Sequence, residues 1–291
     1  MEPTESLSRR ALLGGGGLLR RVRERFDDEL ADAPPSTPRA RPRDFWAAGD
    51  HARLARRTAE AAERLVGALD VRPGERVLDV AAGDGNVALA AARRGAEVVA
   101  IDCTPELLEH GRARAAEAGL IVDWRAGDMN ALPVQSDGFD VVASAFGVIY
   151  GPDMRRATAE LLRVLDTAGG RLGLATWGSA GAMGVVLRAA RRLGAGPRPA
   201  GAPERWGNFD GLRLALDRFP GFELTTKALS WRYPDRDALW SDLSAPPGPL
   251  AGAADAARAD MEERLAPFLR DTGEALELRV DWCLALAALD G

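Results

Sequence analysis

The sequence predicts an α/β protein built on a doubly wound, mostly parallel sheet of seven strands. Five short apolar runs alternate with alanine- and leucine-rich helical runs between residues 76 and 177. Such alternation predicts parallel strands whose sheet is covered by helices on both faces. Two longer runs with strand character follow, at residues 222–233 and 275–286, and bring the expected number of strands to seven.

The first βαβ unit carries the strongest functional signal. An apolar strand at Arg76–Val80 runs into a turn that contains Gly83 and Gly85, and a helix is expected over residues 87–94. Units of this form bind nucleoside-containing ligands at the carboxyl ends of their strands. The glycines let the backbone come close to such a ligand because they carry no Cβ. The second strand, at residues 97–102, ends on Asp102, whose carboxylate could accept hydrogen bonds from both ribose hydroxyls.

Helical periodicity and breaker residues place the remaining elements. An amphipathic helix is expected from about Asp44 to Leu69, ahead of the first strand. The third, fourth and fifth strands are expected at 121–126, 137–146 and 171–177, with later helices at 153–165, 178–193, 210–219, 235–243 and 251–269. Residues 1–40 are expected to form a flexible basic N-terminal arm, and residues 41–291 a single domain.

The arm also resembles an export signal in part, because Ser8-Arg9-Arg10 precedes a short apolar run. The charged block at residues 20–25 follows at once and would interrupt a translocating core, so a mobile arm is the preferred interpretation. The proline-rich stretch at residues 34–38 supports it, since such a segment buries too little apolar surface to offset its ordering entropy.

The composition of the 291-residue chain limits the classes of partner and the cellular setting that we expect. Its net charge of −5 argues against nucleic acid, which favours a basic surface. The two cysteines, Cys103 and Cys283, give neither a disulfide framework nor metal-ligand spacing, so no metal and a reduced, cytoplasmic setting are expected. No apolar run reaches the roughly 20 residues that a membrane span needs. The oligomeric state is left open, with a homodimer as one option.

Two nucleoside ligands fit the glycine turn. Residues 83–88 read Gly-Asp-Gly-Asn-Val-Ala and satisfy the dinucleotide pattern, with an acidic residue about 20 positions on. Asp79, inside the preceding strand, argues against this interpretation because its carboxylate would repel a pyrophosphate. S-adenosylmethionine (SAM) has no phosphate and carries an ammonium and a sulfonium, so acidic groups favour its binding.

The chain closely resembles the SAM-dependent methyltransferases of the ubiquinone/menaquinone-biosynthesis type. The resemblance covers residues 46–177 and extends more loosely to the C-terminus. The matching segments are Val77–Asn86, Gly127-Asp128, Phe139–Val142 and Leu161–Leu165 with Gly169-Gly170. Ala81 stands where the family's glycine loop has its first glycine. The resemblance implies a Rossmann-like methyltransferase fold that uses SAM as its cofactor.

Cofactor contacts are carried over from this resemblance position by position. Asp79, Ala81, Gly83 and Gly85 would lie at the methionine moiety of SAM, and Asp102 with its neighbour Cys103 at the ribose. Asp128 and Met129 would lie at the adenine, and Phe146 at the methyl-transfer centre. Asp84 has two interpretations, as a partner of the SAM ammonium or as a turn-setting residue. The resemblance also implies an N-terminal helix folded over SAM, a last strand antiparallel between the fifth and sixth strands, and lid helices around residues 235–270.

The expected reaction is C- or O-methylation of a small hydrophobic, aromatic or polyketide-like acceptor, in quinone-like or natural-product biosynthesis. His51 and Tyr150 are the candidate general bases, although an acidic phenol or enol needs no strong base, whereas His110 is expected on the surface. The candidate pocket walls are Phe45, Trp46, Phe146, Val148, Ile149, Tyr150, Trp177, Trp206, Trp231 and Trp240. Three alternatives stay open: a SAM-binding protein that promotes a cyclisation or rearrangement without methyl transfer, an NAD(P)-dependent oxidoreductase, and a protein-interaction module that recruits a partner through its basic arm.

Overall fold

The computed structural model describes residues 46–289 apart from 48, 152, 196–208, 217, 218, 220, 247 and 254. The basic arm expected at residues 1–40 lies outside the described residues, as do Phe45 and Trp206. Within the described part, none of the helices is long and apolar enough to cross a membrane.

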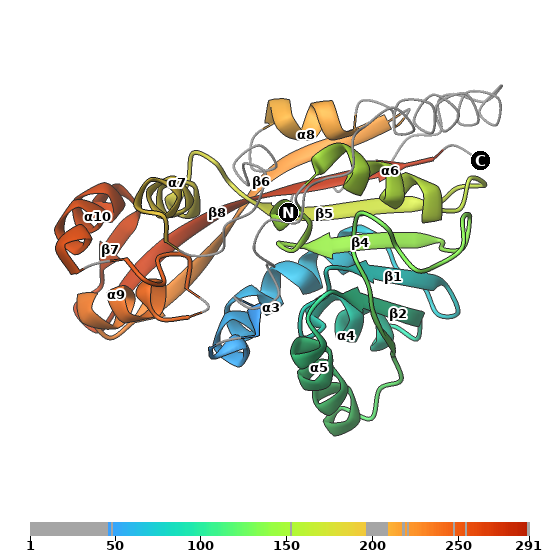
Figure 1. Cartoon of the computed structure of the whole chain (residues 1–291), viewed down its shortest axis with the longest axis horizontal. Coiled ribbons are helices and arrows are strands. Elements are labelled where there is room, and N and C mark those ends of the chain that lie inside the picture. Colours follow the sequence, from blue (N-terminus) through green and yellow to red (C-terminus); the bar gives the residue numbers. More distant parts are fainter. Residues whose placement is uncertain are drawn as a thin grey trace, which may run out of the picture.

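A central sheet organises the described chain, and its strand order is β3-β2-β1-β4-β5-β8-β6 (Figure 1). The first five strands pair in parallel, which confirms the doubly wound arrangement. β8 lies antiparallel between β5 and β6, as the family resemblance implied. The strands are β1 (Arg76–Val80), β2 (Glu97–Asp102), β3 (Asp123–Ala126), β4 (Val141–Ala145), β5 (Arg171–Trp177), β6 (Gly221–Tyr233), β7 (Leu269–Asp271) and β8 (Leu276–Ala288).

The two last long strands extend beyond the rest of the sheet. β8 pairs with β5 only from Ala288 back to Trp282, which lies opposite Trp177 at the end of β5. The remaining half of β8 continues past that point and stays paired with β6 as far as Leu276. This two-stranded extension carries the lid segment (residues 235–270) beyond the carboxyl ends of the parallel strands (Figure 1).

The helices occupy both faces of the sheet. α3 (His51–Ala68), α4 (Asn86–Ala92) and α5 (Pro105–Glu117) lie on one side, and α6 (Met154–Val164) and α8 (Phe209–Leu216) lie on the other (Figure 1). The extension is flanked by α7 (Ala182–Leu193), α9 (Arg236–Ser244) and α10 (Arg258–Leu265). Short 3-10 turns, η1 (Val148–Tyr150), η3 (Asp255–Ala257) and η4 (Ala266–Phe268), complete the described elements.

α3 packs closely on the sheet because β5 offers a glycine beneath it. A Cβ at Gly173 would come within 2.7 Å of Leu69 and 2.8 Å of Leu65. The helix also has a defined start, since the Asp50 side chain accepts a hydrogen bond from the Arg53 N–H at 3.1 Å. His51, Leu54 and Thr58 line the same cavity as residues at the carboxyl ends of β2 and β4, so the first turns of α3 lie at that edge of the sheet.

The structure corrects the sequence prediction in the lid segment. The single helix expected over residues 251–269 is instead η3, α10 and η4, followed by a short strand, β7. Pro267 lies in η4 and cannot continue an α-helix, because it lacks an N–H and its ring clashes with the preceding turn. β7 then pairs with the extended half of β8, so the sheet formed by the described residues has eight strands where seven were expected.

Candidate cofactor and acceptor cavity

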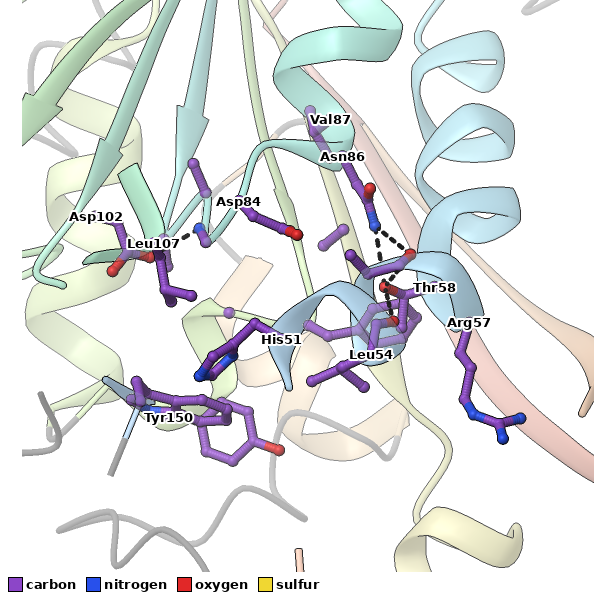
Figure 2. Close-up of a pocket in the computed structure, with 18 of the residues that line it drawn as sticks. His51, Leu54, Arg57, Thr58, Asp84, Asn86, Val87, Asp102, Leu107 and Tyr150 are labelled. Carbon is purple, nitrogen blue, oxygen red and sulfur yellow. Dashed lines mark hydrogen bonds between the residues drawn. The ribbon is translucent and has the colours of Figure 1, made fainter. Parts of the chain in front are cut away.

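A cavity of about 430 Å³ opens at the carboxyl ends of β1, β2 and β4, beneath the first turns of α3 (Figure 2). Segments far apart in the sequence meet there: the glycine turn after β1, the end of β2, the segment after β3, and the lid segment. The cofactor-binding candidates that line it are Asp79, Ala81, Gly83, Asp102, Cys103, Asp128, Met129 and Phe146, together with His51 and Tyr150. Gly85 is not among the lining residues.

Asp102 holds the glycine turn in place. Its Oδ2 accepts a hydrogen bond from the Gly83 N–H at 2.8 Å, and its Oδ1 accepts one from the Thr104 N–H at 2.8 Å. Each carboxylate oxygen has a further lone pair, so Asp102 can still accept hydrogen bonds from a ligand. Burial raises the pKa of Asp102.

Asp79 lies behind this turn and is 1% exposed. Its Oδ2 accepts a hydrogen bond from the Ala88 N–H in the first turn of α4, at 2.9 Å. Burial, with the negative charges of Asp102 and Asp84, raises the pKa of Asp79 to about 8. Burial also raises the pKa of Asp84, although the nearby Arg114 partly offsets this. Three acidic groups at one end of the cavity therefore favour a cationic ligand.

This hydrogen bonding disfavours a dinucleotide. In a dinucleotide site, N–H groups at the glycine turn and the helix N-terminus point at the pyrophosphate. Here the Gly83 N–H donates to Asp102 and the Ala88 N–H donates to Asp79. A diphosphate at this position would therefore lie next to carboxylates and would lack the N–H donors that it needs.

The two glycines of the turn have different roles. Gly83 has φ +57°, and a Cβ there would meet nothing within 4 Å, so it leaves open space on the cavity side. Gly85 has φ +87°, and a Cβ there would lie 2.2 Å from the Trp124 ring. Gly85 therefore permits a left-handed turn and close packing on Trp124, and its expected contact with the methionine moiety stays a prediction.

Two non-glycine residues beside the cavity also adopt left-handed backbone. Ala81 has φ +55°, and Phe146 has φ +60°. They follow neighbouring strands, β1 and β4, and a Cβ at Gly147 would come within 2.4 Å of the Ala81 carbonyl oxygen. Alanine at position 81 thus adopts the backbone conformation that glycine adopts more easily, at a cost of about 1–2 kcal/mol. Such strain concentrates at functional sites.

Asn86 connects the glycine turn to α3. Its Nδ2 donates to the Ala55 carbonyl at 2.8 Å and to the Thr58 hydroxyl at 3.1 Å (Figure 2). Its Oδ1 accepts a hydrogen bond from Arg114 at 2.8 Å, and the same arginine forms an ion pair with Asp84 at 3.1 Å. The closing helix is therefore fixed to the turn by side chains that the sequence analysis did not single out.

The adenine candidates lie after β3. Asp128 Oδ1 accepts a hydrogen bond from the Asn130 N–H at 2.9 Å, and Met129 packs partly buried against the core. Cys103, next to Asp102, is exposed as a residue, but desolvation of its thiol and the negative charge of Asp102 raise the pKa of the thiol. Asp128, Met129 and Cys103 all line the cavity.

Aromatic rings line the middle of the cavity. Phe146 stacks on Trp177 with ring centroids 3.7 Å apart, and Trp177 meets Trp231 edge-on at 5.9 Å. Trp46 meets Tyr150 edge-on at 4.9 Å. The three other described wall candidates, Val148, Ile149 and Trp240, are buried but do not line the cavity.

The two candidate bases differ in their surroundings. Burial raises the pKa of Tyr150 to about 12, although a hydrogen bond with Trp177 partly offsets this, so the phenol is neutral at pH 7. Tyr150 can therefore donate or accept a hydrogen bond but does not act as a phenolate base. His51 is 6% exposed, and its ring points into the same space as Asp84 and Tyr150 (Figure 2). His110 is exposed, as expected.

The far end of the cavity holds charged residues that sequence reasoning missed. Arg53 and Arg57 lie one turn apart on α3, and both approach Asp242 of α9, at 2.6 Å and 3.0 Å. The Tyr233 hydroxyl donates to the same carboxylate at 2.7 Å. The i, i+4 spacing of the two arginines was visible in the sequence, but Asp242 lies far away along the chain.

Comparison with known proteins shows a partial match to a methyltransferase domain and a shared fold. Residues 77–169 match the sequence model of a methyltransferase domain. The fold is the Rossmann-like methyltransferase fold: the YcgJ protein of Bacillus subtilis superposes with a TM-score of 0.57 at 19% identity, covering 80% of this chain and 99% of that one. Residues 77–169 are therefore similar to a methyltransferase domain, within a chain that has the fold of Rossmann-like methyltransferases.

Relatives with higher sequence identity match only part of the chain. An uncharacterized protein of Mycobacterium tuberculosis is 45% identical over 150 residues, which is 51% of this chain and 54% of that protein. The demethylmenaquinone methyltransferase of Renibacterium salmoninarum is 40% identical over 105 residues, 36% of this chain and 43% of that enzyme. The chain thus spans about half the length, or less, of these curated relatives.

Proposed function

We propose that the protein is a methyltransferase that transfers the methyl group of SAM to a carbon or oxygen nucleophile of a small hydrophobic acceptor. The observation that carries this proposal is a single cavity with an acidic end at the glycine turn and an aromatic wall next to it. The partial identity to a demethylmenaquinone methyltransferase supports a ring-shaped acceptor in quinone-like or natural-product biosynthesis.

The residues present fit SAM. Asp102 would accept hydrogen bonds from the ribose, while Asp79 and Asp84 would favour its positively charged methionine portion. Gly83 leaves room for the ligand where a side chain would stand. Asp128 and Met129 would lie at the adenine. The raised pKa values of these three carboxyl groups support this assignment, because a cation would stabilise their ionised forms.

SAM supplies an already electrophilic methyl group, so the protein must mainly position the nucleophile. Positioning can supply roughly 7–11 kcal/mol of the barrier. Phe146 and Trp177 would hold an acceptor ring at the end of β4, while α3 and the lid segment exclude water. Exclusion of water favours attack by an anionic nucleophile on the cation, since the two charges partly cancel. Tyr150 would orient the acceptor by hydrogen bonding, and His51 would accept its proton where one must be removed.

Calorimetry with SAM, S-adenosylhomocysteine and NAD⁺ tests the cofactor. We expect SAM and S-adenosylhomocysteine to bind and NAD⁺ not to bind; NAD⁺ binding without SAM binding would overturn the proposal. Activity is tested by following S-adenosylhomocysteine formation with a panel of phenols and hydroxyquinones. Turnover of an acceptor without S-adenosylhomocysteine formation would instead indicate the cyclisation or rearrangement alternative.

A further inference from the structure

The cavity is electrostatically asymmetric. Its glycine-turn end contains Asp79, Asp84 and Asp102, whereas its lid end contains Arg53 and Arg57. Figure 2 shows Arg57 on the opposite side of the drawn residues from Asp102. An acidic end suits the cationic cofactor, but nothing in a neutral hydrophobic acceptor would require two guanidinium groups at the other end.

The two arginines are not fully neutralised by their protein partner. Arg53 and Arg57 share one carboxylate, that of Asp242, and no second acidic side chain pairs with either of them among the described residues. Burial raises the pKa of Tyr233, and the Asp242 carboxylate raises it further, so the tyrosine adds no negative charge. The group therefore carries a net charge of about +1 where it lines the cavity.

Arg57 is held in place but incompletely bonded. Its guanidinium lies over the Tyr233 ring at 4.2 Å and the Trp231 ring at 5.3 Å, and its side chain is 18% exposed. Its buried Nε lies 3.0 Å from Asp242 without the geometry of a hydrogen bond and has no other partner. Within the described chain, its terminal nitrogens make no hydrogen bond either. A planar guanidinium with free donors is suited to a carboxylate, which it can bind through two parallel hydrogen bonds.

We propose that the lid end of the cavity is a carboxylate-binding subsite, and that the acceptor is an aromatic acid. Its carboxylate pairs with Arg53 and Arg57, and its ring lies along Trp231 and Trp177 toward Phe146. This inference rests on the proposed function, since it names the substrate class of the same cavity. The ion pair with Asp242 has a second effect: it links α3 to the lid segment, so an acid bound there also contacts the lid.

The test compares 1-naphthoate with 1-naphthamide, which are nearly equal in size and differ in charge. Both are titrated by ligand-observed NMR into protein saturated with S-adenosylhomocysteine, which fills the cofactor end. We expect the naphthoate to bind about tenfold more tightly, as charge-assisted hydrogen bonds predict. Arg57→Gln and Arg53→Gln should each remove most of this preference.

Arg56→Gln is the matched control, because Arg56 is exposed on the same helix and does not line the cavity. It should keep the preference for the carboxylate. Thermal melting of each variant reports whether α3 and the lid segment stay folded. If Arg57→Gln does not fold, Arg53→Gln alone tests the preference for the carboxylate. Equal or undetectable binding of the two probes by the wild type, or an unchanged preference in both arginine variants, overturns the inference. Failure of S-adenosylhomocysteine to bind would instead contradict the proposed cofactor site.

Discussion

The carboxylate of Asp102 accepts a hydrogen bond from the backbone N–H of Gly83, and this bond joins the ends of β2 and β1 at 2.8 Å. The residue expected at the ribose therefore also shapes the turn expected at the methionine moiety. Because the Gly83 N–H is already used, the turn presents carboxylate oxygens to the cavity in place of amide donors. The predictions below follow from this arrangement.

Replacing Asp102 with alanine should weaken SAM binding by about tenfold or more. Each hydrogen bond to a charged acceptor contributes roughly 1.5–3 kcal/mol, and the variant also releases the glycine turn. Isothermal titration calorimetry measures the affinity, with circular dichroism as the check on folding. Asp123→Ala is the control, since Asp123 is an exposed residue at the start of the neighbouring strand. Unchanged affinity in a folded Asp102 variant would remove this residue from the ribose.

SAM affinity should rise with pH up to about pH 8. The pKa of Asp79 is raised to about 8 without ligand, so its carboxyl group is largely protonated at pH 7. A cation favours the ionised form, so binding releases a proton, and affinity increases by at most about tenfold per pH unit below that pKa. Titrations between pH 6 and 8.5 measure this dependence.

Asp79→Asn supplies the control for the pH dependence. Asparagine can still accept the hydrogen bond from the Ala88 N–H but cannot ionise. The variant should lose the part of the pH dependence that comes from residue 79, while any contribution from the SAM amino group remains. Equal slopes in the two proteins would mean that Asp79 does not titrate on binding.

Alanine substitutions at Gly83 and Gly85 should have different effects: the first should mainly weaken SAM binding, and the second should mainly lower the stability of the fold. Gly83→Ala should cost about 1–2 kcal/mol of folding free energy from its left-handed backbone, yet weaken SAM binding strongly, because the new methyl group enters the cavity. Gly85→Ala should lower the folding free energy by about 1–3 kcal/mol more than Gly83→Ala does, since its methyl group overlaps the Trp124 ring. Thermal melting and calorimetry on both variants give the comparison. The reverse ranking of melting temperatures would contradict the assigned roles.

Asn86→Ala should release the first turns of α3. The variant leaves the Arg114 donor and the Ala55 carbonyl without their partner, at a cost of about 1–3 kcal/mol. Hydrogen exchange measured by mass spectrometry should therefore speed up in the first turns of α3, and SAM should bind more weakly. Thr58→Val, which removes only one of the acceptors, should have a smaller effect. Unaltered exchange in the Asn86 variant would show that other contacts hold the helix.

Much of the fold and of the cofactor end could be predicted because the signals are local. An apolar strand, a glycine turn and a strand-terminal aspartate lie within 27 residues, and parallel strands bring their carboxyl ends to one edge. Asp79, Gly83 and Asp102 do line the cavity at that edge. The role of Gly85 could not be predicted, because the Trp124 ring against it comes from another strand.

The lid end shows the limit of local signals. The sequence analysis did not single out Arg53 and Arg57, since the sequence gives no sign that Asp242 lies within 3.0 Å of them. Pro267, which ends the helix, was visible in the sequence. β7, however, forms because it pairs with the extended half of β8, and this pairing was not visible there.

The sequence by itself determined the class of fold and the acidic residues at the glycine-turn end of the cavity, because short-range patterns specify strands, turns and the residues that end them. The tertiary structure alone decided which aromatic side chains face the cavity, how α3 is fixed to the glycine turn, and that two arginines share one carboxylate at the lid end. These features depend on contacts between residues up to 189 positions apart. Only the packing of the folded chain sets the distances between such residues.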